Sequence, residues 1–308
     1  MSGLPVVAVV GPTAAGKSAL AVELALALGG DVINADSAQV YRGMDIGTAK
    51  LPPALRRGIP HHCFDLWDVT ETASVAVYRE AARAAIEDVE SRGAVPLLVG
   101  GSGLYIEAVL RELDFPGTDP GLRADLEQQA DQLGPDALWR RLAEEDPVAA
   151  QRIPSGNLRR VIRALEVVTL TGRPYAASLP DGAAWWRPTL RFTVEAETEV
   201  LQPRLAERAR RMWRDGLLDE VRALLPQGLA DGTTASRAIG YAQALAVLRG
   251  DLDLADGVEE TIRLTWRVVR RQRAWFTRDD DAVRLDGADP AAVRTVLDAL
   301  GSPRVTAP

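Results

Sequence analysis

Cysteine and histidine are almost absent from this chain of 308 residues, which contains one cysteine, Cys63, and two adjacent histidines, His61 and His62. A single thiol excludes an intramolecular disulfide and a cysteine-rich zinc module. Two neighbouring imidazoles also make a histidine-based metal site an unfavourable interpretation. The scarcity of cysteine favours a protein of a reducing compartment.

Long apolar runs are missing as well. No segment approaches the roughly 20 consecutive apolar residues that a membrane-spanning helix needs. The apolar run 4–10 is too short for the core of a signal peptide with its flanks, and it leads directly into a motif. We therefore expect a cytoplasmic protein without a membrane partner.

Lysine is rare too, because Lys17 and Lys50 are the only lysines among 36 lysines and arginines. The net charge of −7 by itself argues against a nucleic-acid partner, yet the arginines are distributed unevenly. Four lie between 152 and 163, six lie between 263 and 278, and neither segment contains an acidic residue. Such segments are often solvated helix faces, but local basic faces also attract phosphates on an acidic protein.

The first third of the chain alternates strand and helix patterns. Buried strands are predicted at 6–10, 32–35 and 95–99, and amphipathic helices at 18–28 and 74–92. Fully apolar strands that alternate with helices indicate a parallel sheet covered on both faces. We therefore expect an α/β fold with a parallel sheet of the P-loop NTPase type.

The pattern changes at Phe115, because only helical periodicity follows, with helices expected to open at Asp119, Asp136 and Asn157. A strand pattern returns at 190–194, and most of the remaining chain is again helical. These changes predict an all-helical insertion domain at 115–185. The α/β core is then formed by 1–114 and 186–308.

The segment Gly11–Ser18 follows a strand, opens a helix and fits the P-loop pattern G-x-x-x-x-G-K-[ST]. Its glycines let backbone N–H groups turn towards phosphate oxygens, and the helix N-terminus adds partial positive charge. Lys17 supplies a point charge for the terminal phosphates, and the Ser18 hydroxyl is a candidate ligand of Mg²⁺. The predicted phosphate-binding residues are Gly11, Pro12, Thr13, Ala14, Ala15, Gly16, Lys17 and Ser18.

A P-loop ATPase usually has an acidic residue at the end of an apolar strand, where it holds Mg²⁺. The strand 95–99 ends in the sequence GGS instead, and the strand that ends in a carboxylate is 32–35, followed by Asp36. Asp36 is expected beside the P-loop at the carboxyl ends of the strands, where it would face an acceptor group rather than the metal. This place suggests a general base, whereas an isolated Asp before Ser is more often a turn or helix cap.

Two further polar residues are candidates for the same site. Ser102, in the segment GGSGLY, is equally suited to capping the helix that it opens and to bonding a substrate. Arg237, in the segment TASRAIGY, would usually lie on the surface. Beside a P-loop, however, its guanidinium fork would bind two oxygens of a diphosphate.

Together these motifs resemble those of the bacterial tRNA dimethylallyltransferases, also called tRNA isopentenyltransferases. The resemblance spans about residues 5–278 and lies in the segments GPTAAGKS, INADSAQVYRGMDIGTAK, PHHCFD, PLLVGGSGLYIEAVL, NLRRVIRALEV, SRAIGYAQAL and RRQRAWF. It implies transfer of a dimethylallyl group from dimethylallyl diphosphate to the exocyclic amine of an adenosine. That adenosine lies 3′ of the anticodon in tRNAs that read codons beginning with U.

The resemblance also implies roles for individual residues. Asp36 would be the catalytic base, and Lys17, Arg237 and a Mg²⁺ ion on Ser18 would stabilise the departing diphosphate. Ser102 stands where the family has threonine, so the hydroxyl is kept and a methyl group is lost. Contacts with the tRNA anticodon stem-loop are implied for Asp36, Ser37, Ala38, Gln39, Ser102, Arg123, Arg159, Arg160, Val161, Ile162 and Arg163. The arginine-rich segments would bind phosphates of the stem, and a monomer is expected.

One residue departs from the family pattern, and another matches it without a derived role. Trp266 stands where the family often has arginine, which removes a charge from the helix that carries RRQRAWF. Lys50 belongs to the matching segment DSAQVYRGMDIGTAK, and its expected role is a contact with the tRNA or with the donor.

Three alternatives remain open. A small-molecule P-loop kinase would need ATP and an acidic residue after the third strand, which is missing. An adenylate isopentenyltransferase would share the donor site but would need neither the helical insertion nor the arginine-rich segments. A non-enzymatic RNA-binding module would leave Asp36 beside the P-loop without a task.

Overall fold

The computed structural model describes residues 5–175, 183–277 and 281–301, and the chain forms two compact units. The first unit joins Met1–Arg111 to Ala184–Pro308, and the second unit, which is helical, consists of Glu112–Ala183. The second unit therefore begins three residues earlier and ends two residues earlier than the range 115–185 expected from the sequence.

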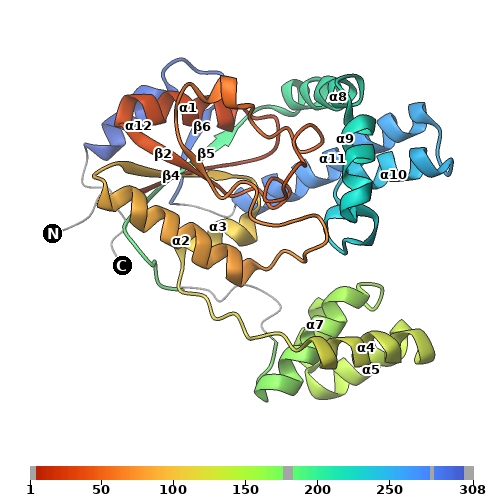
Figure 1. Cartoon of the computed structure of the whole chain (residues 1–308). Helices are drawn as coiled ribbons and strands as arrows, with labels where there is room; N and C mark the ends of the chain where they lie inside the picture. Colours follow the sequence, from red (N-terminus) through yellow and green to blue (C-terminus); the bar gives the residue numbers. More distant parts are fainter. Residues whose placement is uncertain (1–4, 176–182, 278–280, 302–308) are drawn as a thin grey trace. The chain divides into compact units, whose positions relative to one another are not determined.

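A six-stranded sheet forms the centre of the first unit (Figure 1), and every pair of neighbouring strands is parallel. The strand order is β3-β2-β4-β1-β5-β6, so the first strand of the chain is central. The strands are β1 Val6–Val10, β2 Gly30–Asn34, β3 His61–His62, β4 Val95–Gly100, β5 Thr189–Glu195 and β6 Val283–Asp286. The predicted α/β fold with a parallel sheet is confirmed, although the sequence did not reveal the short edge strands β3 and β6.

Helices cover both faces of this sheet. The helices of the first unit are α1 Lys17–Leu28, α2 Val75–Ser91, α3 Gly103–Leu110, α8 Thr198–Arg214, α9 Leu217–Leu224, α10 Tyr241–Arg249, α11 Leu254–Phe276 and α12 Ala292–Leu300. Short 3₁₀ turns are η1 Pro53–Arg56, η2 Leu225–Gln227, η3 Leu229–Asp231 and η4 Ala235–Arg237. None of the helices in the three described ranges is long and apolar enough to cross a membrane.

The two faces follow from the alternation of side chains along a strand. Val6, Ala8 and Val10 of β1 are fully buried in one core with residues of α2 and α3. Val7 and Val9 are fully buried in a second core with residues of α1 and α12. Both faces of β1 are therefore apolar, which is why the strand reads as a continuous run of Val and Ala.

The loops that leave β2 and β4 meet at the carboxyl edge of the sheet. The backbone N–H of Ser102 donates to the oxygen of Ala35 over 3.2 Å, and the N–H of Ala35 donates to the oxygen of Val99 over 2.7 Å. The two backbones pass so closely that a Cβ atom on Gly100 would lie 2.1 Å from the Ala35 oxygen. Glycine is therefore needed at position 100, because it lets the segments that carry Asp36 and Ser102 approach each other closely.

The second unit contains α4 Pro120–Leu133, α5 Pro135–Glu145, α6 Pro147–Arg152 and α7 Leu158–Thr171. Its core includes Leu126, Leu142 and Leu165, all fully buried. As the sequence predicts, helices begin after Asp119 and Asn157, which cap α4 and α7. Oδ1 of Asp119 accepts hydrogen bonds from the backbone N–H groups of Gly121 and Leu122 over 2.8 and 3.0 Å.

A buried carboxylate lies at the start of β2, away from the carboxyl edge. Oδ2 of Asp31 lies 2.9 Å from Nε2 of His62 and accepts a hydrogen bond of 2.8 Å from Arg92. Burial by itself raises the pKa of Asp31, but the hydrogen bonds from His62 and Arg92 outweigh burial and hold the pKa below its usual value. A carboxyl group whose pKa is lower in the folded state than in the unfolded state stabilises the fold at pH values above its usual pKa. This stabilisation is lost as the pH falls through the folded-state pKa.

We expect Asp31→Asn to lower the free energy of unfolding by about 1–3 kcal/mol at neutral pH, because charge-assisted hydrogen bonds to a buried carboxylate are lost. The difference from the wild type should shrink as the pH falls through the folded-state pKa of Asp31, which lies below its usual value. Urea denaturation across this pH range measures both effects. Asp88→Asn is the matched control, because Asp88 also bonds Arg92 but is exposed. A difference that is independent of pH would contradict this account.

Candidate active site

The P-loop lies between β1 and α1, as the sequence predicts. Gly11 has a φ of 141°, and a Cβ atom there would lie 2.2 Å from the oxygen of Val194, so the loop requires glycine at this position. Nζ of Lys17 donates a hydrogen bond of 2.8 Å to the oxygen of Pro12. The loop thus holds the ammonium group against its own backbone.

Gln272 of α11 connects the P-loop with the loop that follows β4. Its Oε1 accepts a hydrogen bond of 2.9 Å from the backbone N–H of Thr13, and its Nε2 donates one of 3.0 Å to the oxygen of Gly101. A Cβ atom on Gly101 would lie 2.4 Å from this Nε2. Sequence reasoning missed Gln272, because its partners lie 259 and 171 positions away along the chain.

Asp36 lies in the turn that follows β2 and is half-buried. Its Oδ1 accepts a hydrogen bond of 3.0 Å from the backbone N–H of Ala38, so the turn-forming role that the sequence also allowed is present. Within the described residues, however, Oδ2 of Asp36 accepts no hydrogen bond. One carboxylate oxygen therefore remains for a proton of a substrate.

Two cationic side chains interact with the Asp36 carboxylate. Desolvation by burial lowers the pKa of Lys17 to about 8, against the attraction of Asp36, and the charge of Arg208 lowers it further. Burial also lowers the pKa of Arg208, and the negative charge of Asp36 again opposes this effect. Three charges thus share one poorly solvated place. A diphosphate there would meet two cations, and an acceptor amine would meet one carboxylate.

Arg208, on α8, is a site residue that the sequence analysis did not identify. Its Nη2 donates to the backbone oxygen of Thr48 over 3.3 Å. Its Nε is buried and has no hydrogen-bond partner in the parts of the chain that the structure describes. Several other arginines occur on α8, so no local pattern distinguishes Arg208 from its neighbours.

Ser102 occupies the N-cap position of α3, but its side chain makes no capping hydrogen bond. Its Oγ instead accepts a hydrogen bond of 2.9 Å from the backbone N–H of Ser37 and lies 3.0 Å from Oγ of Ser37. The capping alternative is therefore wrong. The hydroxyl ties the turn that carries Asp36 to the loop after β4, and its contact with a substrate stays a prediction.

Arg237 is exposed at the end of η4, and its side chain makes no hydrogen bond or ion pair with any residue in the described ranges. The structure thus brings Arg208 towards Lys17 and Asp36, but it shows no contact between Arg237 and the P-loop. The predicted role of Arg237 in binding diphosphate stays a prediction.

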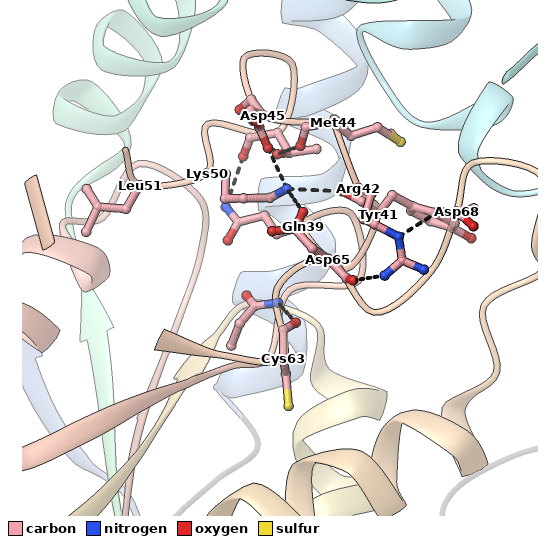
Figure 2. A network of polar contacts seen from close by, with 12 residues as sticks. Gln39, Tyr41, Arg42, Met44, Asp45, Lys50, Leu51, Cys63, Asp65 and Asp68 are labelled. Carbon is pink, nitrogen blue, oxygen red and sulfur yellow. Dashed lines mark hydrogen bonds and ion pairs between the residues drawn. The ribbon is translucent and has the colours of Figure 1, made fainter. Parts of the chain in front are cut away.

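Lys50 is buried, and its ammonium group has three partners within the protein (Figure 2). Nζ donates to Oδ1 of Asp45 and to Oδ1 of Asp65, each over 2.6 Å, and to the backbone oxygen of Tyr41 over 3.0 Å. A lysine ammonium has three N–H donors, so all of them are used. The expectation that Lys50 contacts the tRNA or the donor is therefore corrected, because Lys50 fixes the loop around it.

A basic groove lies along α11. Its walls include the exposed side chains of Arg267, Arg270 and Arg271 together with Ile239, and its volume is about 540 Å³. None of the three guanidinium groups makes an ion pair or hydrogen bond with a residue that the structure describes. Arg263, in contrast, is paired with Glu260. Arg278, the last member of this arginine-rich segment, lies outside the described residues.

Trp266 lies in the same helix and packs against the apolar core on the α1 side of the sheet. Its indole is partly buried among apolar side chains. The aromatic side chain at this position therefore contributes to packing.

The predicted tRNA-binding residues of the helical unit have different surroundings. Arg123 and Arg163 both bind Oε2 of Glu166, which is fully buried, over 2.5 and 2.7 Å. Val161 and Ile162 are buried in the core of this unit, so their side chains are not available to a ligand, and this part of the expectation is corrected. Arg159 and Arg160 at the start of α7 are exposed. Of the predicted set, these two are best placed for phosphates.

A Mg²⁺ ion would have few protein ligands at this site. Ser18 is exposed in the first turn of α1, directly after Lys17. Among the described residues, no group of three or more His, Cys, Asp or Glu side chains is arranged to hold a metal. Mg²⁺ typically keeps several waters and takes most other ligands from substrate phosphates. A single hydroxyl beside a phosphate-binding loop fits that requirement.

The fold and the site define a P-loop α/β protein, with a carboxylate beside the phosphate-binding loop and a separate helical unit. The profile of the IPP transferase family matches residues 39–279, and that of isopentenyl transferases matches residues 4–55. The chain belongs to the IPP transferase family.

Relatives and solved structures agree with this assignment. A tRNA dimethylallyltransferase of Salinispora arenicola is 56% identical over 96% of this chain and 86% of its own length. One of Streptomyces coelicolor is 53% identical over 98% and 96% of the two chains. A crystal structure of a tRNA isopentenylpyrophosphate transferase from Bacillus halodurans has a TM-score of 0.69 at 36% identity and covers 97% and 95% of the two chains. A structure of a eukaryotic dimethylallyltransferase acting on tRNA has a TM-score of 0.77 at 27% identity and covers 96% and 77% of the two chains.

We expect Lys50→Met to lower the free energy of unfolding by about 1–3 kcal/mol, because it leaves the Tyr41 oxygen without its donor and two carboxylates without their shared cation. Chemical denaturation measures the loss. Arg214→Met is a suitable control. It removes a cation whose ion pair with Glu207 is exposed on both sides, and such pairs contribute at most about 1 kcal/mol. Equal losses in the two variants would contradict a buried structural role for Lys50.

Proposed function

We propose that this protein transfers the dimethylallyl group of dimethylallyl diphosphate to the exocyclic amine of the adenosine 3′ of the anticodon in tRNAs reading codons that begin with U. The observation that carries the proposal is the position of the Asp36 carboxylate, which interacts with the P-loop lysine and with Arg208. Family membership supports the reaction class, and the names of the relatives support tRNA as the acceptor.

In the proposed reaction, the adenosine nitrogen attacks the primary allylic carbon of the donor. The bond between this carbon and the diphosphate oxygen breaks, and diphosphate leaves with both bonding electrons. Asp36 accepts the proton that the amine loses, through the oxygen that has no hydrogen bond within the described residues. Proton transfer to a positioned base typically contributes roughly 10²–10⁴-fold to the rate.

The leaving diphosphate needs positive charge and N–H donors, because negative charge develops on its bridging oxygen. The P-loop backbone, Lys17 and Arg208 supply these groups in a poorly solvated site. When bound, Mg²⁺ would neutralise charge on the diphosphate, and Ser18 would be its protein ligand. Arg208 thus adds a second cation beside Lys17, and binding of the diphosphate by Arg237 stays a prediction.

The acceptor adenosine has to leave its stack to reach Asp36, because an exocyclic amine inside a stacked loop is inaccessible. The backbone phosphates on either side need basic partners. Exposed arginines lie on α11, at Arg267, Arg270 and Arg271, and at the start of α7, at Arg159 and Arg160. We propose that both sets bind tRNA phosphates. This role explains why a protein with a net negative charge has basic surfaces.

A small-molecule kinase and an adenylate isopentenyltransferase are less favoured. Strand β4 ends at Gly100 and is followed by Gly101 and Ser102, so no acidic side chain stands at its carboxyl end. The relatives that match nearly the whole chain are tRNA-modifying enzymes.

Radiolabelled dimethylallyl diphosphate, offered together with tRNA, AMP and ATP, tests the proposed function. We expect label in tRNA, and digestion of that tRNA to nucleosides should place the label on adenosine. Label that appears only in AMP, or phosphoryl transfer from ATP, would overturn the proposal.

We expect Asp36→Asn to lower kcat at least about 100-fold, because the amide keeps the hydrogen bond from Ala38 but does not accept a proton. Donor affinity should stay within a few-fold, as judged by titration with dimethylallyl diphosphate. Asp68→Asn, an exposed carboxylate in a neighbouring loop, is the control with the same change of charge. If turnover by Asp36→Asn is close to that of the wild type, Asp36 is not the base.

The groove of Arg267, Arg270 and Arg271 predicts a salt effect. Replacing all three with Gln should weaken tRNA binding and reduce the slope of log K against log salt by about 2 to 3, if each arginine neutralises one phosphate. A control triple variant at Arg214, Arg222 and Arg249 removes the same charge, but each of these arginines is already paired with a carboxylate. Equal slopes for the two triple variants would exclude the groove from tRNA binding.

A further inference from the structure

The carboxylate of Glu220, on α9, receives four hydrogen bonds from other elements. Its Oε2 accepts from the backbone N–H groups of Asp45 and Ile46 over 3.1 and 2.7 Å. Its Oε1 accepts from the backbone N–H of Gly47 over 3.2 Å and from the hydroxyl of Tyr241. One half-buried carboxylate therefore clamps three consecutive backbone amides of a loop more than 170 residues away in the sequence.

The other side of this clamp is formed by Tyr241, the first residue of α10, which is fully buried. Its ring lies so close to the loop that a Cβ atom on Gly47 would be 2.5 Å from it. Burial and the neighbouring Glu220 carboxylate both raise the pKa of Tyr241, so its hydroxyl stays protonated and donates to Glu220. The clamp holds the turn Asp45–Gly47 from two directions.

The clamped turn leads directly to the active site. The next backbone oxygen, that of Thr48, accepts hydrogen bonds from Nη2 of Arg208 over 3.3 Å and from Nε2 of Gln39 over 3.0 Å. Because Nε of Arg208 has no partner within the described residues, the Thr48 oxygen is the contact that orients this guanidinium. Lys50, two residues after Thr48, pairs with Asp45 of the clamped turn and with Asp65 (Figure 2).

We infer that Glu220 is a positioning residue of the active site, which acts through the Asp45–Gly47 turn and the Thr48 oxygen to hold Arg208 beside Lys17 and Asp36. The inference rests on the proposed function for its effect on catalysis, but its effect on anion binding does not depend on it. A guanidinium that is displaced by about 1 Å stabilises a transition state much less. A clamp that served stability alone would leave the binding of an anion at the P-loop unchanged.

Glu220→Gln tests the inference, because the amide keeps the size of the side chain but offers fewer acceptor sites to the loop. We expect kcat for dimethylallyl transfer to fall about 10-fold or more, since Arg208 is no longer held in place. The dissociation constant of inorganic pyrophosphate with Mg²⁺, measured by calorimetry, should rise several-fold, while the KM for tRNA stays within about two-fold. Asp219→Asn, the adjacent exposed carboxylate on α9, should change none of these values.

A double-mutant cycle separates positioning from stability. In an Arg208→Ala background, Glu220→Gln should weaken pyrophosphate binding less than about two-fold, because its route to the site is already broken. A full, additive effect in that background would overturn the inference, as would unchanged pyrophosphate binding accompanied only by a lower melting temperature. Tyr241→Phe removes one donor of the clamp with little change of shape. It should shift pyrophosphate binding in the same direction if Glu220→Gln folds poorly.

The proposed function has its own outcome in these measurements. A wild-type protein that transfers no label to tRNA would overturn the proposed function. The pyrophosphate cycle still decides the role of Glu220 in that case, because it requires only an anion at the P-loop.

Discussion

The close approach of parallel strands at one edge of the sheet is the constraint on which the site depends. Parallel pairing brings the carboxyl ends of β1, β2 and β4 together, and the loops that leave them have no room for side chains between their backbones. Gly100 lies against the oxygen of Ala35, and Gly11 lies against the oxygen of Val194. These contacts bring the P-loop, Asp36 and Ser102 to the same edge of the sheet, although helices separate their strands along the chain.

The charges of Lys17, Arg208 and Asp36 then determine what this edge of the sheet can bind. Burial weakens the charged forms of Lys17 and Arg208, and the Asp36 carboxylate supports both. A bound diphosphate would supply negative charge to the two cations, so that Asp36 no longer has to balance them alone. The arrangement suits a reaction in which an anion departs on one side and a proton is removed on the other. Helix α11 supports it through Gln272, which joins the P-loop to the loop after β4.

Much of the fold was predictable, because its signals are local. The apolar runs of β1, β2 and β4 and the capping residue Asp119 each act within a few positions of themselves. The edge strands β3 and β6 were missed because two and four residues are too few to show a pattern. Lys50 was misinterpreted because nothing in the sequence shows that Asp45 and Asp65 converge on its ammonium group. For the helical unit, the arginine-rich pattern at α7 was evident, but the ion pair of Arg163 with the buried Glu166 was not.

The sequence by itself determined the family, the P-loop and the presence of a carboxylate after β2, because a contiguous motif acts through the conformation of its own backbone. Only the tertiary structure decided which arginine faces the site. Arg208 is one of several arginines on α8, and it is distinguished by the Thr48 oxygen, which lies 160 residues away and is held by the loop that Glu220 clamps. Hydrogen bonds between distant segments depend on how helices pack on the sheet. That packing follows from burial of many side chains together rather than from any short pattern of residues.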